Sequence, residues 1–190
     1  MLTLLTSLCA SYTHTPLALY ALKAYAVSRE PDLAEEILIE SFTINQTDGF
    51  ILRGIYRRKP DAVGFSCYGW NMEKTVRVAS ALRKLLPGIK IIFGGPEMAA
   101  EHEEYLARGI ADAVIRGEGE QAFYEWLADW RSRQKGTGSA KRGDIPAAVP
   151  LDLSRLPFPY PRDLSGLENK IIYYEASRGC PFSCGYCLSS

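Results

Sequence analysis

The sequence has no excess of charge of either sign. Lys and Arg together number 22 and so do Asp and Glu, which gives a formal net charge of zero at pH 7. Because this balance creates no broad basic or acidic field, we expect no nucleic-acid partner. Hydrophobic residues make up 47% and charged residues 23%, proportions that exclude a disordered, collagen-like or coiled-coil chain.

Long uninterrupted hydrophobic runs are missing as well. The first charged side chain is Lys23, but Ser7, Ser11 and Pro16 interrupt the segment before it, and no Lys or Arg precedes that segment. A transmembrane helix needs about 20 predominantly apolar residues, and a signal peptide needs a basic start. We therefore expect no membrane partner and a cytoplasmic location.

Cysteine is scarce outside one short stretch. The chain has five Cys, and three of them, Cys180, Cys184 and Cys187, fall in the last eleven residues. A secreted disulfide scaffold distributes its cysteines along a short chain, so this class of protein is excluded.

The sequence does contain short apolar runs that alternate with amphipathic stretches. Strands separated by helices predict βαβ units and a parallel sheet with helices on both faces. We therefore predict an α/β, flavodoxin-like (Rossmann-like) fold with a five-stranded sheet. The predicted strands are residues 2–9, 37–42, 62–67, 89–93 and 113–115, and the predicted helices are 16–27, 48–58, 72–86, 97–107 and 123–130.

The composition divides the chain into three parts. Residues 1–133 contain the predicted α/β domain. Residues 134–169 are first rich in Gly and Ser and then in Pro, which is typical of an extended linker. Residues 170–190 begin with one more predicted strand, at 170–177, and continue into the cysteine cluster.

Four loops follow predicted strands and should meet at one edge of the sheet. Doubly wound sheets bind ligands beyond the carboxyl ends of their strands, which selects residues 11–15, 66–71, 94–98 and 116–121. Glycines in these loops allow a ligand to approach the backbone closely. The structural alternative is that each glycine is required by a turn between strand and helix.

The cysteines have the spacing C-x3-C-x2-C. A [4Fe–4S] cluster normally takes four Cys thiolates, so three would leave one iron open to another ligand. A zinc site is the alternative, although it would need a fourth ligand. The pattern, with Tyr186 before the last Cys, resembles the signature of radical SAM enzymes. The resemblance implies a cluster on Cys180, Cys184 and Cys187, S-adenosylmethionine on the open iron, Tyr186 near its adenine, and an external one-electron reductant.

The whole chain resembles cobalamin-binding (B12-binding) radical SAM proteins. The resemblance rests on the sequences from Gly94 to Glu97 and from Gly117 to Glu120, and on the stretch from Ile172 to Cys184. It implies that cobalamin binds at the edge of the sheet, with Ser66 on the nucleotide tail and aromatic side chains over the ring. The implied contacts are Tyr12, Thr13, His14, Ser66, Cys67, Tyr68, Gly69, Gly94, Gly95, Pro96, Glu97, Gly117, Glu118 and Gly119.

The first loop departs from the family pattern. Many cobalamin domains carry D-x-H-x-x-G there, and the His ligates cobalt from below. Here the loop has Tyr12, His14 and Leu17 at the three motif positions, so the Asp that would orient the imidazole is missing. We expect a lower cobalt face that is free or occupied by water, with His14 as the alternative ligand.

The resemblance implies a function for a longer protein. We expect an enzyme that transfers a methyl group by radical chemistry on an unknown substrate. The chain would contain only the first strand of a radical SAM barrel, so by itself it should be inactive, and we expect its tail beyond about Arg178 to be disordered or distorted. The alternatives are a radical SAM oxidoreductase or cyclase with a degenerate B12-like domain, and a zinc-binding interaction module.

Overall fold

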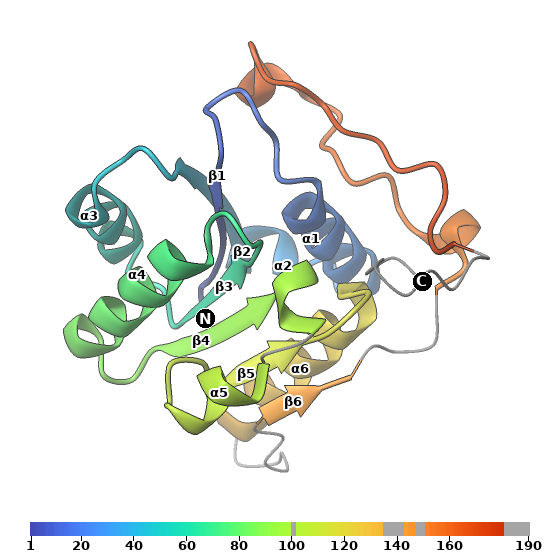
Figure 1. Cartoon of the computed structure of the whole chain (residues 1–190). Coiled ribbons are helices and arrows are strands. Elements are labelled where there is room, and N and C mark those ends of the chain that lie inside the picture. The colour runs from blue at the N-terminus through green and yellow to red at the C-terminus, as the bar shows by residue number, and fades with distance from the viewer. Residues whose placement is uncertain (100–101, 135–142, 147–150, 181–190) are drawn as a thin grey trace.

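The computed structural model describes residues 1–99, 102–134, 143–146 and 151–180 of the chain (Figure 1). Its centre is a six-stranded sheet in the order β2-β1-β3-β4-β5-β6, in which every neighbouring pair is parallel. The strands are β1 (Thr3–Cys9), β2 (Ile37–Thr43), β3 (Ala62–Ser66), β4 (Lys90–Gly94), β5 (Ala113–Ile115) and β6 (Gly143–Ile145).

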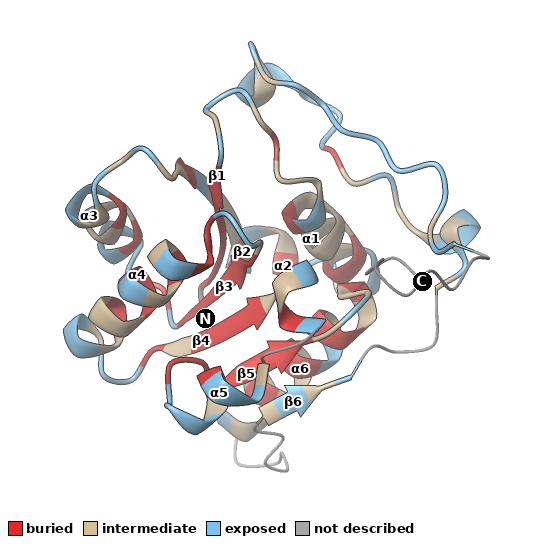
Figure 2. Cartoon of the chain, viewed as in Figure 1, coloured by how far each residue is buried: buried red, intermediate tan, exposed pale blue. Residues whose placement is uncertain are grey.

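Helices cover both faces of the sheet. One core joins the sheet to α3, α4 and α5, and a second core joins the opposite face to α1, α2 and α6. All seven residues of β1 are buried, as expected for a central parallel strand (Figure 2). The helices are α1 (Leu17–Arg29), α2 (Leu33–Glu36), α3 (Asp48–Arg58), α4 (Met72–Leu85), α5 (His102–Ala107) and α6 (Glu120–Gln134), with short 3-10 turns η1 (Pro96–Ala99), η2 (Leu153–Arg155) and η3 (Ser165–Leu167).

Local sequence signals explain most of these elements. In α3, Thr47 caps the first turn by accepting a hydrogen bond from the Phe50 amide, and the C-cap residue Lys59 is left-handed. The predicted α/β fold and all five predicted strands are confirmed. None of the described helices is both long and apolar enough to cross a membrane.

The predicted number of strands is wrong, because β6 adds a sixth strand from the region expected to be a linker. Gly143–Ile145 pairs with Ala113–Ile115 at the edge of the sheet. Arg116 holds this edge through two hydrogen bonds of 2.7 Å to the Asp144 carboxylate. A segment of three residues is too short to show a hydrophobic periodicity, so this strand could be recognised only from its pairing with β5.

Two other predicted elements differ from the structure. The helix expected at 97–107 appears as η1 and α5, with residues 100 and 101 outside the described part. The strand expected at 170–177 is absent: a single bridge joins Ile171 to His14, and residues 172–179 have no ladder partner among the described residues. Residues 156–178, here called the strap, run beside α1 toward the start of α6 (Figure 1).

Candidate functional site

The edge of the sheet at the carboxyl ends of the strands carries a row of small residues. Ser7 of β1 pairs with Ser66 of β3, and Ser66 pairs with Gly94 of β4. Leu5 and Ile92, two residues earlier on the same face, belong to the core formed with α1 and α6. Because side chains alternate along a strand, the row faces these two helices. It therefore leaves side-chain volume free at the edge where such sheets bind ligands.

Gly94 and Gly95 are adjacent but have different surroundings. Gly95 has a φ of 109°, and a Cβ there would lie 2.5 Å from the carbonyl oxygen of Cys67. The two loops pack backbone against backbone, with the Cys67 amide donating to the Gly94 oxygen at 2.6 Å. A Cβ on Gly94, by contrast, would meet nothing closer than the Ile115 oxygen at 3.7 Å. Packing therefore explains Gly95, whereas Gly94 leaves space that no described protein atom requires.

Two more candidate glycines, Gly117 and Gly119, lie in the turn between β5 and α6. Gly117 has a φ of 68°, which favours glycine. A Cβ on Gly119 would lie 3.1 Å from Cδ2 of Leu22 in α1. These glycines therefore serve the turn and the close approach of α1 and α6, as the structural alternative predicted.

Cys67 does not present its side chain to this edge. Its thiol is fully buried in the core formed with α3, α4 and α5, and it contacts the Phe65 oxygen at 3.6 Å. Burial raises the pKa of the Cys67 thiol. Cys67, one of the contacts that the resemblance implied, can therefore reach a bound cobalamin only through its backbone. Alternation along the chain explains this, because Cys67 and its neighbour Ser66 point to opposite faces.

Asn71 organises the loop after β3, and the sequence analysis did not single it out. Its side chain is fully buried, accepts a hydrogen bond from the Tyr68 amide at 2.9 Å and donates to the carbonyl oxygens of Leu8 and Ser66. The loop then presents Tyr68 and Trp70 as a stacked pair, with ring centroids 4.3 Å apart. Trp70 is 58% exposed. These rings form an apolar surface beside the row of small residues.

The strap is bound to the loop between β1 and α1. The Ile171 amide donates to the Thr13 oxygen at 2.7 Å, and the Thr15 hydroxyl donates to the Ile171 oxygen at 2.6 Å. Tyr160 is buried against the same region and donates to the Tyr173 oxygen at 2.8 Å. These contacts hold the strap over the start of α1.

The strap also engages His14 and Tyr12. The Tyr173 hydroxyl lies 2.5 Å from Nδ1 of His14, and the two rings are stacked with centroids 5.8 Å apart. Tyr173 was not a candidate in the sequence analysis, yet it contacts the imidazole nitrogen that a carboxylate would orient in the family motif. The Lys170 ammonium lies 3.3 Å from the ring centroid of Tyr12, a cation–π contact.

At its other end the strap is bound by Arg178. The guanidinium makes two hydrogen bonds to Glu120, of 2.6 and 3.2 Å, and lies 3.3 Å from Glu118 and 2.7 Å from Glu175. The Glu120 side chain is only 6% exposed. Burial by itself would lower the pKa of Arg178, but its hydrogen bonds to Glu120 and Glu175 outweigh that effect and raise the pKa.

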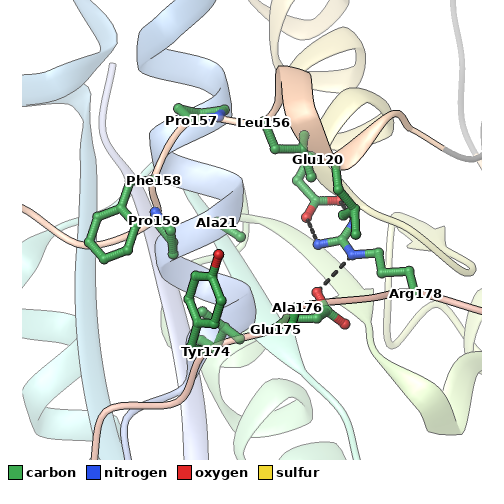
Figure 3. Close-up of a pocket in the computed structure, with 12 residues that line it drawn as sticks. Ala21, Glu120, Leu156, Pro157, Phe158, Pro159, Tyr174, Glu175, Ala176 and Arg178 are labelled. Atoms are coloured by element: carbon green, nitrogen blue, oxygen red, sulfur yellow. Dashed lines mark hydrogen bonds and ion pairs between the residues drawn. The ribbon is translucent and has the colours of Figure 1, made fainter.

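A pocket of about 230 Å³ lies between the strap and the first turns of α1 and α6 (Figure 3). Leu17 and Ala21 of α1 and Phe158 and Tyr174 of the strap provide apolar walls. The ion pairs of Arg178 close one side of it. The strap thus covers the same helix pair that faces the row of small residues.

The cysteine cluster begins immediately after the strap. Cys180 is exposed and is not in a disulfide. Residues 181–190 lie outside the described residues, and they include Cys184, Tyr186 and Cys187. The prediction for the tail beyond Arg178 falls mostly on the same residues. Within the described part of the chain, no group of three or more His, Cys, Asp or Glu side chains could hold a metal ion.

The model of the family described as B12 binding domain matches residues 5–127. The chain belongs to the B12-binding domain family. It is 30% identical, over 67% of its length, to 2-(S-pantetheinyl)-carbapenam-3-carboxylate methyltransferase of Streptantibioticus cattleyicolor, of which the match spans 22%. It is 26% identical, over 93% of its length, to the cobalamin-dependent radical SAM methyltransferase TokK of Streptomyces tokunonensis, of which the match spans 28%. The chain therefore spans about a quarter of these relatives.

A solved structure with a similar fold is that of the apo form of the cobalamin-dependent S-adenosylmethionine radical enzyme OxsB. The alignment covers 94% of this chain and 26% of the OxsB chain, with a TM-score of 0.62 and 17% sequence identity. The similarity shows the fold of the B12-binding domain.

The residues at the sheet edge fit a bound cobalamin. Gly94 leaves open space beside two buried serines, on the face between α1 and α6, and the stacked rings of Tyr68 and Trp70 lie in the next loop. The remaining candidates from the sequence lie in the loops and in η1 at the same edge: Tyr12, Thr13, His14, Gly69, Pro96, Glu97 and Glu118.

Proposed function

We propose that this chain is the cobalamin-binding part of a cobalamin-dependent radical SAM methyltransferase. The observation that carries the proposal is the open row of Ser7, Ser66 and Gly94 at the edge of a B12-binding domain. The strap leads from this edge to the C-x3-C-x2-C sequence. The relatives named above as methyltransferases support the choice of reaction.

Each part of the site has a separate task in this proposal. Ser66 and Gly94 accept the nucleotide tail, because the Ser66 hydroxyl can hydrogen-bond to it and the missing side chain at Gly94 leaves room beside that hydroxyl. Tyr68 and Trp70 shield the corrin from water. Cys180, Cys184 and Cys187 hold a [4Fe–4S] cluster to which S-adenosylmethionine binds, with Tyr186 at its adenine and an external reductant supplying one electron at a time. When bound, these groups supply a substrate radical and a transferable methyl group.

His14 is not required as a cobalt ligand in this proposal. Its Nδ1 contacts the Tyr173 hydroxyl, and a neutral hydroxyl polarises an imidazole less than a carboxylate does. In this proposal the lower face of a bound cobalamin would therefore be free or occupied by water.

Retention of hydroxocobalamin tests the first half of the proposal. The full-length protein is mixed with hydroxocobalamin and desalted, and its visible spectrum is recorded. We expect retained corrin absorption, and a loss of retention in Gly94→Ala, since the methyl group enters the space assigned to the nucleotide tail. Gly88→Ala is the matched control, because a Cβ at Gly88 meets nothing within 4 Å and Gly88 lies before β4, at the opposite edge of the sheet. A full-length protein that retains no corrin would refute the proposal and leave the domain as a scaffold.

Metal and sulfide analysis tests the second half. Prepared without oxygen, the full-length protein should contain iron and acid-labile sulfide, and Cys184→Ala should lose both. Zinc without sulfide would instead establish the interaction-module alternative.

A further inference from the structure

Arg178 joins two parts of the chain that are far apart in sequence. Its guanidinium extends from the end of the strap to Glu120 at the start of α6 (Figure 3). It also contacts Glu118 in the turn between β5 and α6. Its third partner, Glu175, lies on the strap itself. One side chain thus connects the segment before the cysteines to the edge of the sheet.

The burial of these groups makes the connection specific. The side chains of Arg178 and Glu120 are only 18% and 6% exposed. Exposed ion pairs contribute little to stability, but a bidentate and partly buried pair is stronger and has a defined geometry. Removing one partner leaves the other charge buried without compensation, which is costly.

The geometry also requires arginine rather than any cation. The guanidinium directs its N–H groups to three carboxylates at once, with Nε on Glu175 and the two terminal nitrogens on Glu120 and Glu118. The compact ammonium of lysine has no planar fork and cannot reproduce this arrangement.

Arg178 lies close in sequence to the first cysteine, and its partners lie close to the proposed cobalamin edge. Glu118 and Glu120 flank Gly119 in a turn at the proposed cobalamin edge. Cys180 follows Arg178 by two residues, and two residues span at most about 7 Å. The start of the cysteine loop is therefore restrained relative to the edge of the sheet.

We propose that Arg178 is a positioning residue that docks the cysteine loop on the turn carrying Glu118 and Glu120 and so sets the separation between cluster and corrin. The inference rests on the proposed function, because that function places the two groups on either side of this contact. Arg178 itself touches neither reacting group in this proposal.

Hydrogen exchange of the full-length protein tests the docking. In Arg178→Gln, we expect the peptide covering 171–177 to exchange about tenfold faster at its hydrogen-bonded amide, that of Ile171, which donates to the Thr13 oxygen; this is equivalent to a loss of about 1.4 kcal/mol. Arg178→Lys should recover part of the protection. Arg131→Gln is the matched control, since Arg131 is 20% exposed and forms a 2.6 Å ion pair with Glu30, but it lies at the far end of α6. We expect this control to leave the exchange of 171–177 unchanged.

Electron paramagnetic resonance tests the positioning. In the wild-type protein loaded with cob(II)alamin and a reduced cluster, the cluster should speed the relaxation of the cobalt spin. We expect Arg178→Gln to weaken this coupling several-fold while cobalt and iron contents stay the same. A residue that only stabilised the fold would lower the unfolding temperature without changing the coupling in the folded protein, as expected for Arg131→Gln.

The outcomes separate the inference from the function on which it rests. A wild-type protein that holds no corrin or no cluster refutes the proposed function, and the exchange of 171–177 then decides the docking. If both groups load and Arg178→Gln leaves both the exchange and the spin coupling at wild-type values, the positioning role is wrong. A double variant, Arg178→Gln with Glu120→Gln, removes the uncompensated charge and should still show the weakened coupling.

Discussion

Replacement of Gly95 by alanine should strongly destabilise the protein. At a φ of 109° an L-residue is strained, which costs about 1–3 kcal/mol. The new Cβ would also lie 2.5 Å from the carbonyl oxygen and 2.9 Å from the amide nitrogen of Cys67, so the two loops must separate. Separation weakens the 2.6 Å bond from the Cys67 amide to the Gly94 oxygen, at about 0.5–1.5 kcal/mol. Further strain in the displaced loops brings the expected total to about 3 kcal/mol or more, a large fraction of the stability of an ordinary domain.

Urea unfolding measures this effect, with the midpoint and the slope compared between variants. Gly49→Ala is the control: Gly49 lies in α3, its φ is ordinary, and a Cβ there meets nothing within 4 Å. This helical substitution should stabilise the protein by roughly 0.5–1 kcal/mol. If Gly95→Ala loses less than about 1 kcal/mol with an unchanged slope, the backbone-packing explanation of Gly95 is refuted.

Three further predictions concern other parts of the structure. Burial would raise the pKa of Asp112, but hydrogen bonds from Arg83 and from the Ile91 amide outweigh it and lower the pKa. A lowered pKa in the folded state stabilises the protein above the unfolded pKa of about 3.9, so Asp112→Asn should cost roughly 2 kcal/mol at pH 7. This difference should shrink as the pH falls below the unfolded pKa; a urea midpoint gap that does not narrow with falling pH would contradict the assignment. Thr47→Ala should cost about 1 kcal/mol in the same assay, because α3 loses its cap. In the corrin-loaded protein, His14→Ala should leave the visible spectrum unchanged, and a shifted spectrum would identify His14 as the lower ligand.

The amino-acid sequence was sufficient to locate five of the six strands and most helices. The apolar runs and helical spacing are local properties, and they identified β5 at Ala113–Ile115 and α3 at Asp48–Arg58 as the structure has them. The sequence also located the glycine-containing loops, since the parallel topology brings the carboxyl ends of strands to one edge. The contacts that these loops make could not be predicted from the sequence.

Only the tertiary structure decided how the two ends of the site are joined. β6 is a strand because β5 offers an unpaired edge, and its three residues carry no local signal. The side chain of Cys67 points away from the edge, because side chains alternate along the chain and Cys67 directly follows Ser66. Motif spacing alone does not tell these two orientations apart. The contacts of Tyr173 with His14 and of Arg178 with Glu120 span 159 and 58 residues. Such contacts depend on the path of the strap over α1, which is set by long-range packing rather than by any periodicity in the sequence.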